Sequence, residues 1–136
     1  MTAPIAQIEL ISRKKSESEV MTEIEELLKM DSRIAWAVRV NSGGGKGANG
    51  TFFRACRVIA QAGVKAKDMR AVDIFIMLTN GRAGLIEVKN SEWKFNPKDR
   101  KEVMQKAAID SCVYHGGVAG FARSVEDVSR LLDGAF

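Results

Sequence analysis

Two apolar segments joined by a short polar turn constrain the fold of this chain more than any other feature. Residues 72–78 (Val-Asp-Ile-Phe-Ile-Met-Leu) and 83–89 (Ala-Gly-Leu-Ile-Glu-Val-Lys) flank the turn at residues 79–82 (Thr-Asn-Gly-Arg). An Asn-Gly pair between two apolar runs is the strongest short-range signal for a β-hairpin. The sequence therefore predicts two antiparallel strands in this region.

Helical patterns lie on both sides of the predicted hairpin. Ser16 and Glu19 fit a capping box, and the apolar residues that follow at helical spacing predict a helix of about four turns. Asn96 and Pro97 predict the start of another helix, because asparagine caps helices and proline suits their first position. This helix is expected to end near Tyr114, just before two glycines.

The remaining segments complete an α/β pattern. The glycine-rich stretch 41–50 is predicted to be a loop, and residues 52–62 fit either a strand or a helix, so both remain open. The other expected elements are strands over 34–40 and 118–122 and a last helix from Ser124 to about Leu132. This order of elements predicts an α/β domain with a central mixed sheet flanked by helices.

Length and composition fit a single globular domain. The chain has 136 residues, of which 46% are hydrophobic and 28% are charged, and this balance excludes collagen, coiled coils and disordered chains. No apolar run approaches the roughly 20 residues that cross a bilayer, and the first residues lack the features of a secretory signal, so we expect a cytoplasmic protein without a membrane partner. Two cysteines and one histidine are too few for a disulfide framework or a closed structural zinc site. We expect residues 16–136 to form the domain after an N-terminal extension over residues 1–15.

Positive charge is concentrated in the middle of the chain. Residues 33–70 carry eight Lys and Arg residues against one Asp, whereas residues 1–32 carry four basic and seven acidic residues. A basic segment beside an acidic one suits a protein that presents one face to a polyanion. The candidate contacts with nucleic acid are Arg39, Lys46, Arg54, Arg57, Lys65, Lys67 and Arg70.

Carboxylates interrupt both strands of the predicted hairpin. Asp73 lies in the first apolar run, and Glu87 and Lys89 lie in the second, where alternation places them on one face. Two carboxylates that meet repel each other unless a cation lies between them, and oxygen ligands favour Mg²⁺ or Mn²⁺. Together with a lysine that stabilises charge on a phosphate, these groups are what phosphodiester hydrolysis requires. The competing interpretation is an exposed ion pair on an edge strand.

A shared metal ion places a condition on the hairpin. With Asn80 and Gly81 as the only loop residues, Asp73 would pair with Val88 and would lie on the face opposite Glu87. The metal-site hypothesis therefore predicts a register shifted by one residue, through a bulge, a three-residue loop or a sharp bend at Asp73.

An ordered series of motifs resembles a known nuclease family. Asp73 followed by residues 87–89 (Glu-Val-Lys) resembles the PD-(D/E)XK nuclease signature, and residues 16–132 resemble the VRR-NUC (virus-type replication-repair nuclease) domain. The matching pieces are Ser16-Glu17, Val20, Gln105 and residues 39–43, 72–74, 86–89 and 117–128. The chain departs from the family pattern at residues 70–72 (Arg-Ala-Val), where the family usually has glycine, and at Met21, where it often has glutamine.

The resemblance implies a restriction endonuclease-like fold and Mg²⁺-dependent cleavage of DNA, with branched DNA such as four-way junctions or flaps as the expected substrate. It also implies a homodimer, located in the host cytoplasm if the chain is viral. The metal ligands that it implies are Asp73, Glu87 and Glu17, the catalytic lysine is Lys89, the supporting residue is Gln105, and Asn41 and Ser42 join the expected DNA contacts.

Other interpretations stay open for the chain and for single residues. A non-catalytic DNA-binding module of the same fold is the main alternative. Glu17 could serve only the dipole of its helix, and Gln105 could be a solvated helix residue. Residues 45–50 match the G-x-G-x-x-G fingerprint of nucleotide cofactor enzymes, but the rest of a doubly wound domain is missing.

Overall fold

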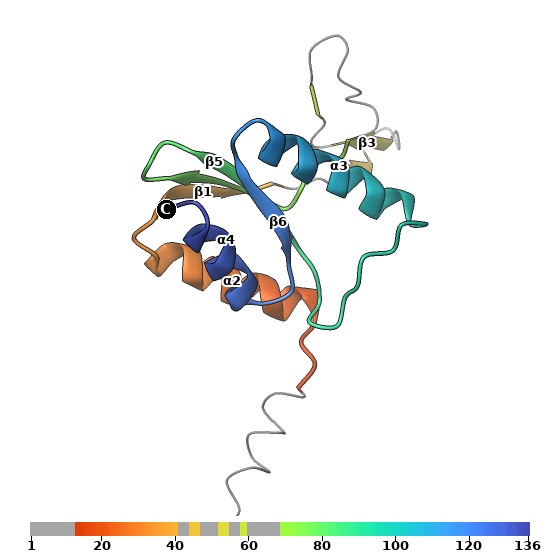
Figure 1. Ribbon diagram of the computed structural model, residues 1–136. Coiled ribbons are helices and arrows are strands. Elements are labelled where there is room, and N and C mark those ends of the chain that lie inside the picture. Colours follow the sequence, from red (N-terminus) through yellow and green to blue (C-terminus); the bar gives the residue numbers. More distant parts are fainter. Residues whose placement is uncertain (1–12, 41–43, 47–51, 55–57, 60–68) are drawn as a thin grey trace, which may run out of the picture.

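The computed structural model describes residues 13–40, 44–46, 52–54, 58–59 and 69–136 (Figure 1). Its helices are α2 (Glu17–Met30), α3 (Arg100–Tyr114) and α4 (Val125–Asp133). Its strands are β1 (Ile34–Arg39), β2 (Gly44–Lys46), β3 (Phe52–Arg54), β4 (Ile74–Leu78), β5 (Ala83–Val88) and β6 (Val118–Ala122).

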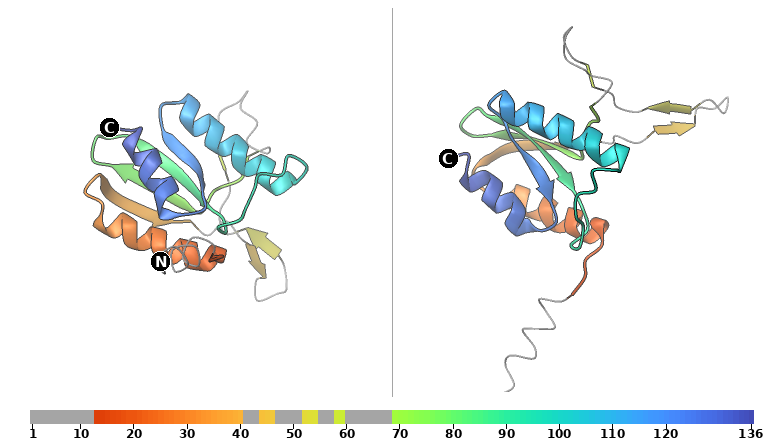
Figure 2. Two further views of the ribbon diagram at one scale, coloured as in Figure 1. Left: turned by 60° about the horizontal axis from the view of Figure 1, so that its bottom comes forward. Right: turned by 45° about the vertical axis from the view of Figure 1, so that its right-hand side comes forward.

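Four of these strands form one mixed sheet in the order β1-β4-β5-β6. β4 is antiparallel to both β1 and β5, whereas β6 is parallel to β5 because α3 carries the chain back between them. Helices α2 and α4 cover one face of the sheet, and α3 covers the other (Figures 1 and 2). The predicted α/β class with a central mixed sheet flanked by helices is confirmed.

Alternation along the strands divides the side chains between the two faces. Ile74, Ile76 and Leu78 of β4 and Ile86 and Val88 of β5 are buried in the core beneath α2 and α4. The intervening residues of β5 and β6, Leu85, Ala119 and Phe121, pack on the α3 side with Ile109. Glu87 therefore belongs to the α3 face by its position in this alternation, whereas Asp73 forms a bend just before β4 at the end of the sheet.

The hairpin has the shifted register that a shared metal ion requires. Ile74 pairs with Ile86 and Met77 with Ala83, and the loop between the strands contains three residues, Thr79 to Gly81. Gly81 adopts a φ of 88°, which glycine tolerates without strain. Continuing this register by one residue places Asp73 opposite Glu87. Of the three expected ways to shift the register, the three-residue loop is therefore present.

Two of the three predicted helix starts are confirmed, and one is wrong. The side chains of Ser16 and Ser124 cap α2 and α4 by accepting hydrogen bonds from the N–H groups three residues on. The helix predicted to begin at Asn96-Pro97 begins instead at Arg100, with Asp99 as its N-cap. The Asn96 side chain accepts from the N–H of Lys98 and closes a turn there, so its capping chemistry serves the loop.

The prediction of a loop over residues 41–50 is wrong in part. Gly44–Lys46 forms strand β2, which pairs with β3 in a separate two-stranded sheet that extends away from the main sheet (Figure 2). The pairing relies on backbone hydrogen bonds, which glycine supplies as well as any other residue. Residues 52–62 were expected to form either a strand or a helix. Residues 52–54 are a strand, whereas residues 55–57 and 60–62 lie outside the described residues.

None of the helices in the described part of the chain combines the length and apolarity needed to cross a membrane.

Candidate metal and phosphate site

Three carboxylates from distant parts of the chain meet at one end of the sheet. Glu17 comes from the first turn of α2, Asp73 precedes β4 and Glu87 lies near the end of β5. One carboxylate oxygen from each residue lies within 4.8 Å of the others. The residues predicted as metal ligands are therefore brought together, although Glu17 is exposed and its carboxylate also suits the start of a helix.

Glu87 is the most constrained member of this acidic cluster. Its side chain is almost fully buried, and its Oε1 atom has no hydrogen-bond partner among the described residues. Burial raises the pKa of Glu87 to about 9, and the neighbouring Asp73 carboxylate adds to the rise. A buried carboxylate that has one orphaned oxygen and lies beside two more carboxylates is a site that favours a cation.

The backbone holds Asp73 in place on both sides. Its Oδ2 atom accepts a hydrogen bond of 2.9 Å from the N–H of Val88, and its carbonyl oxygen accepts one of 2.6 Å from the N–H of Val40. Asp73 thus ties β5 to the end of β1, which fixes its carboxylate beside Glu87.

Lys89 places a positive charge next to the acidic cluster. Its Nζ atom lies 4.0 Å from Oε2 of Glu87 and donates a hydrogen bond of 3.0 Å to Oε1 of Gln105. Gln105 is 2% exposed, so the interpretation of a solvated helix residue is wrong. The predicted group Asp73, Glu87, Lys89 and Gln105 is therefore one connected arrangement built from β4, β5 and α3.

Two aromatic rings, those of Trp93 and Phe121, also contact Lys89. The Nζ atom lies 5.6 Å from the ring centre of Trp93 and 5.9 Å from that of Phe121, within the range of cation–π attraction. The two rings are 4.6 Å apart, and the Nε1 atom of Trp93 donates to Glu102. The spacing of Trp93 four residues after Lys89 was visible in the sequence, but Phe121 comes from another strand and left no local signal.

The predicted nucleic-acid contacts are only partly placed. The Arg39 side chain forms an ion pair of 3.1 Å with Glu25 of α2. The N–H of Arg70 donates to the carbonyl of Met104 in α3, and its buried Nε atom has no partner among the described residues. Lys46 and Arg54 are described only as parts of the β2–β3 pair, whereas Asn41, Ser42, Arg57, Lys65 and Lys67 lie outside the described residues.

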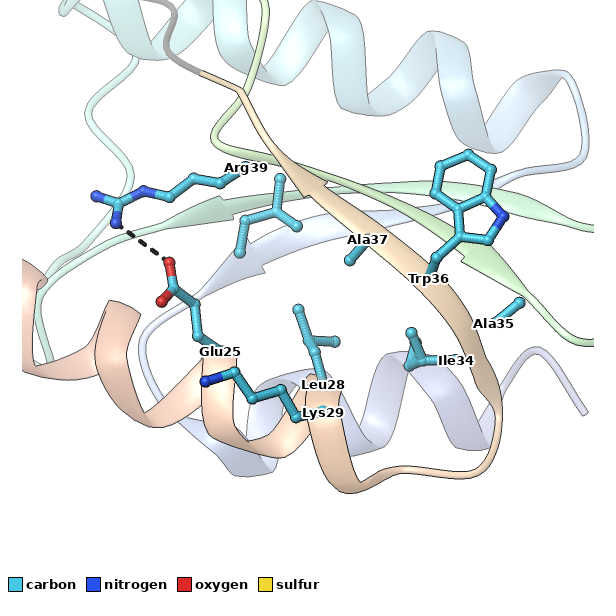
Figure 3. Close-up of a pocket in the computed structure, with 9 residues that line it drawn as sticks. Glu25, Leu28, Lys29, Ile34, Ala35, Trp36, Ala37 and Arg39 are labelled. Carbon is cyan, nitrogen blue, oxygen red and sulfur yellow. Dashed lines mark hydrogen bonds and ion pairs between the residues drawn. The ribbon is translucent and has the colours of Figure 1, made fainter.

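A pocket of about 370 Å³ lies elsewhere, between α2 and the edge strand β1 (Figure 3). Leu28, Ile34 and Ala37 line it, and the Glu25–Arg39 ion pair crosses one end. Arg39 and Lys29 at this pocket are already paired with Glu25 and Glu26, and the other lining residues are apolar, so it offers little chemistry. The acidic cluster with Lys89 is the stronger candidate site.

No protein family model, curated protein or solved structure matches this chain.

Proposed function

We propose that this protein is a Mg²⁺-dependent DNA endonuclease that hydrolyses phosphodiester bonds of branched DNA, with the restriction endonuclease-like arrangement of a VRR-NUC domain. The observation that carries the proposal is the buried Glu87, which has an orphaned Oε1 atom and whose carboxylate belongs to a cluster with Asp73 and Glu17. The mixed sheet with helices on both faces is compatible with this fold.

The donor set fits a hard divalent cation. Glu17, Asp73 and Glu87 offer only carboxylate oxygens, which suit Mg²⁺ or Mn²⁺ and not the softer metals that prefer nitrogen or sulfur. These three residues would hold the ion. When bound, such an ion neutralises charge on the phosphate and lowers the pKa of water.

Lys89 supplies the protein's own positive charge to the reaction. Gln105 accepts one of its ammonium hydrogens, and the rings of Trp93 and Phe121 limit where the ammonium can move. The remaining hydrogens of Nζ can stabilise charge on a phosphate oxygen or orient the attacking water. Lys89 thus acts as the catalytic residue, and Gln105 acts as its positioning residue.

A homodimer would allow the protein to cut both strands of a branched substrate. Each chain carries one such acidic cluster in its described part, and one cluster engages one phosphodiester at a time. Two clusters at a fixed separation are most simply produced by a two-fold axis.

The alternative function is a non-catalytic DNA-binding module. Both functions predict DNA binding, but only the nuclease requires an intact acidic cluster. The grouping of Glu17, Asp73 and Glu87 favours the nuclease, because a binding module gains nothing from three carboxylates that repel a polyanion.

The test is to incubate the protein with linear, flap and four-way DNA, in the presence of Mg²⁺ or of a chelator. We expect cleavage only with Mg²⁺, and a loss of more than about 100-fold in Asp73→Asn and Glu87→Gln with DNA affinity largely retained. Asp110→Asn, an exposed acid on α3, is the matched control and should cleave normally. Binding without Mg²⁺-dependent cleavage would establish the module instead.

A further inference from the structure

Four exposed cations follow β5 in the segment that leads into α3. They are Lys94, Lys98, Arg100 and Lys101, and in the described part of the chain no carboxylate oxygen lies within 4.0 Å of any of them. The other exposed cations whose side chains the structure describes are paired, as Lys29 is with Glu26 and Arg130 with Asp127. We call these four residues the 94–101 patch.

Two of the three acids in this segment, Asp99 and Glu102, hold the loop together, whereas the third, Glu92, is exposed and pairs with Lys14. The Asp99 side chain caps α3 by accepting from the N–H of Glu102. The Glu102 carboxylate accepts from Nε1 of Trp93 at 2.9 Å and from the N–H of Asn96 at 3.1 Å. Because the Asp99 and Glu102 carboxylates bond within the loop and Lys14 neutralises Glu92, the four cations stay without an acidic partner among the described residues.

The loop is also fixed to the rest of the domain. Trp93 packs against Phe121 of β6, and Phe95 lies 6.1 Å from the same ring. Near its start, the N–H of Ser91 donates to the carbonyl of Lys15, and the hydroxyl of Ser91 accepts from the N–H of Lys15. A loop held in this way presents its cations without a large ordering cost on binding.

The patch is connected to the acidic cluster at both of its ends. The loop starts at Lys89, whose ammonium contacts Trp93, and α3 returns to the site at Gln105. Arg100 and Lys101 precede Gln105 by four to five residues, which corresponds to about 6–8 Å along a helix. Each strand of duplex DNA carries one phosphate per about 3.4 Å of axis, so the phosphates next to a scissile bond would fall beside these residues.

We propose that the 94–101 patch holds the phosphodiester backbone of the substrate strand next to the site of cleavage. This inference rests on the proposed function, because it takes DNA as the substrate. It adds a second surface that would contact DNA. The charge distribution along the sequence did not indicate this surface, because basic and acidic residues nearly balance in this segment.

The test measures DNA binding without cleavage, by fluorescence anisotropy of a labelled four-way junction in chelator over a range of salt concentrations. Two patch variants, Lys94→Gln/Lys98→Gln and Arg100→Gln/Lys101→Gln, are compared with Lys29→Gln/Arg130→Gln, which changes the net charge equally. We expect each patch variant to bind roughly tenfold more weakly and to lower the slope of log affinity against log salt by roughly two, because each lost phosphate contact lowers it by about one. The control should keep the wild-type slope.

Patch variants that bind with the affinity and slope of the control would overturn the inference, and they would leave the nuclease proposal intact if the wild type cleaves DNA with Mg²⁺. Patch-dependent binding by a wild type that does not cleave would support the inference as a binding surface and overturn the nuclease. A wild type that does not bind DNA overturns both. Circular dichroism melts of all three variants check that each is folded.

Discussion

At the scale of single residues, the burial of Glu87 links the site to the stability of the fold. Its pKa is raised to about 9, whereas an unfolded glutamate titrates near 4.3. Between these values the folded chain keeps a proton that the unfolded chain has released. Linkage then makes the free energy of unfolding fall as pH rises through this window, by up to about 1.4 kcal/mol per pH unit for one proton.

This linkage predicts a pH-dependent stability that Glu87→Gln removes. In chelator, the wild type should lose stability between pH 6 and pH 8.5, and the variant should lose much less because a glutamine has no proton to release. Urea denaturation of both proteins at the two pH values measures the difference. Parallel losses in the two proteins would mean that Glu87 is ionised in the folded chain.

A second prediction at this scale concerns the contact between Lys89 and Gln105. Gln105→Met keeps a similar volume in the buried position but removes the oxygen that accepts from the ammonium. We expect turnover to fall by about tenfold or more, as for other residues that orient a reacting group, with the Mg²⁺ requirement unchanged. Lys106→Met, on the exposed side of the same helix, should change neither. Unchanged turnover in Gln105→Met would remove Gln105 from the site.

At the scale of secondary-structure elements, two glycines of the hairpin region have different roles. A Cβ atom on Gly84 would lie 2.9 Å from Cγ1 of Ile76 and would meet the carbonyl of Val118, so it would push β6 away from β5. A Cβ atom on Gly81 would meet nothing and would only strain the left-handed backbone of the loop.

We therefore expect Gly84→Ala to lower the free energy of unfolding by about 2–3 kcal/mol and Gly81→Ala by about 1–2 kcal/mol. Gly84→Ala should also reduce cleavage, because Glu87 and Lys89 are carried by the same strand and its end. Denaturant titration of both variants gives the two values. A larger loss in Gly81→Ala than in Gly84→Ala would show that the turn, and not the β5–β6 contact, is the critical feature.

The elements that the sequence predicts well are those that depend on local chemistry. Ser16 and Ser124 cap helices through groups three residues away. The metal-site argument requires a register shifted by one residue, and the three-residue loop, one of the three expected ways, provides it. The helix start predicted at Asn96 is wrong, because the same side chain can cap a helix or close a turn. Strand β2 was not expected because its glycines are typical of a loop, although its partner β3 follows closely in the sequence. The Phe121 ring comes from β6, far from Lys89 in the sequence, so no local pattern could indicate that contact.

At the scale of the whole molecule, the proposed paired cleavage sets a requirement on assembly. One chain brings together Glu17, Asp73 and Glu87 once in its described part, so it can cut one strand for each engagement. We expect light scattering to give a mass of twice 14.9 kDa with a four-way junction bound, after the mass of the DNA is subtracted.

Cleavage of a plasmid that extrudes a cruciform tests whether the two sites act together. A dimer that cuts both strands in one encounter converts the supercoiled circle directly to the linear form, whereas independent monomers produce the nicked circle first. Mixed dimers of the wild type with Asp73→Asn retain one intact cluster, so they should yield nicked circles while they bind the junction as tightly as the wild type. A protein that stays monomeric with the junction, and that nicks plain duplex equally fast, would exclude the dimer. It would leave the nuclease itself in place, because hydrolysis at each site depends only on residues of one chain.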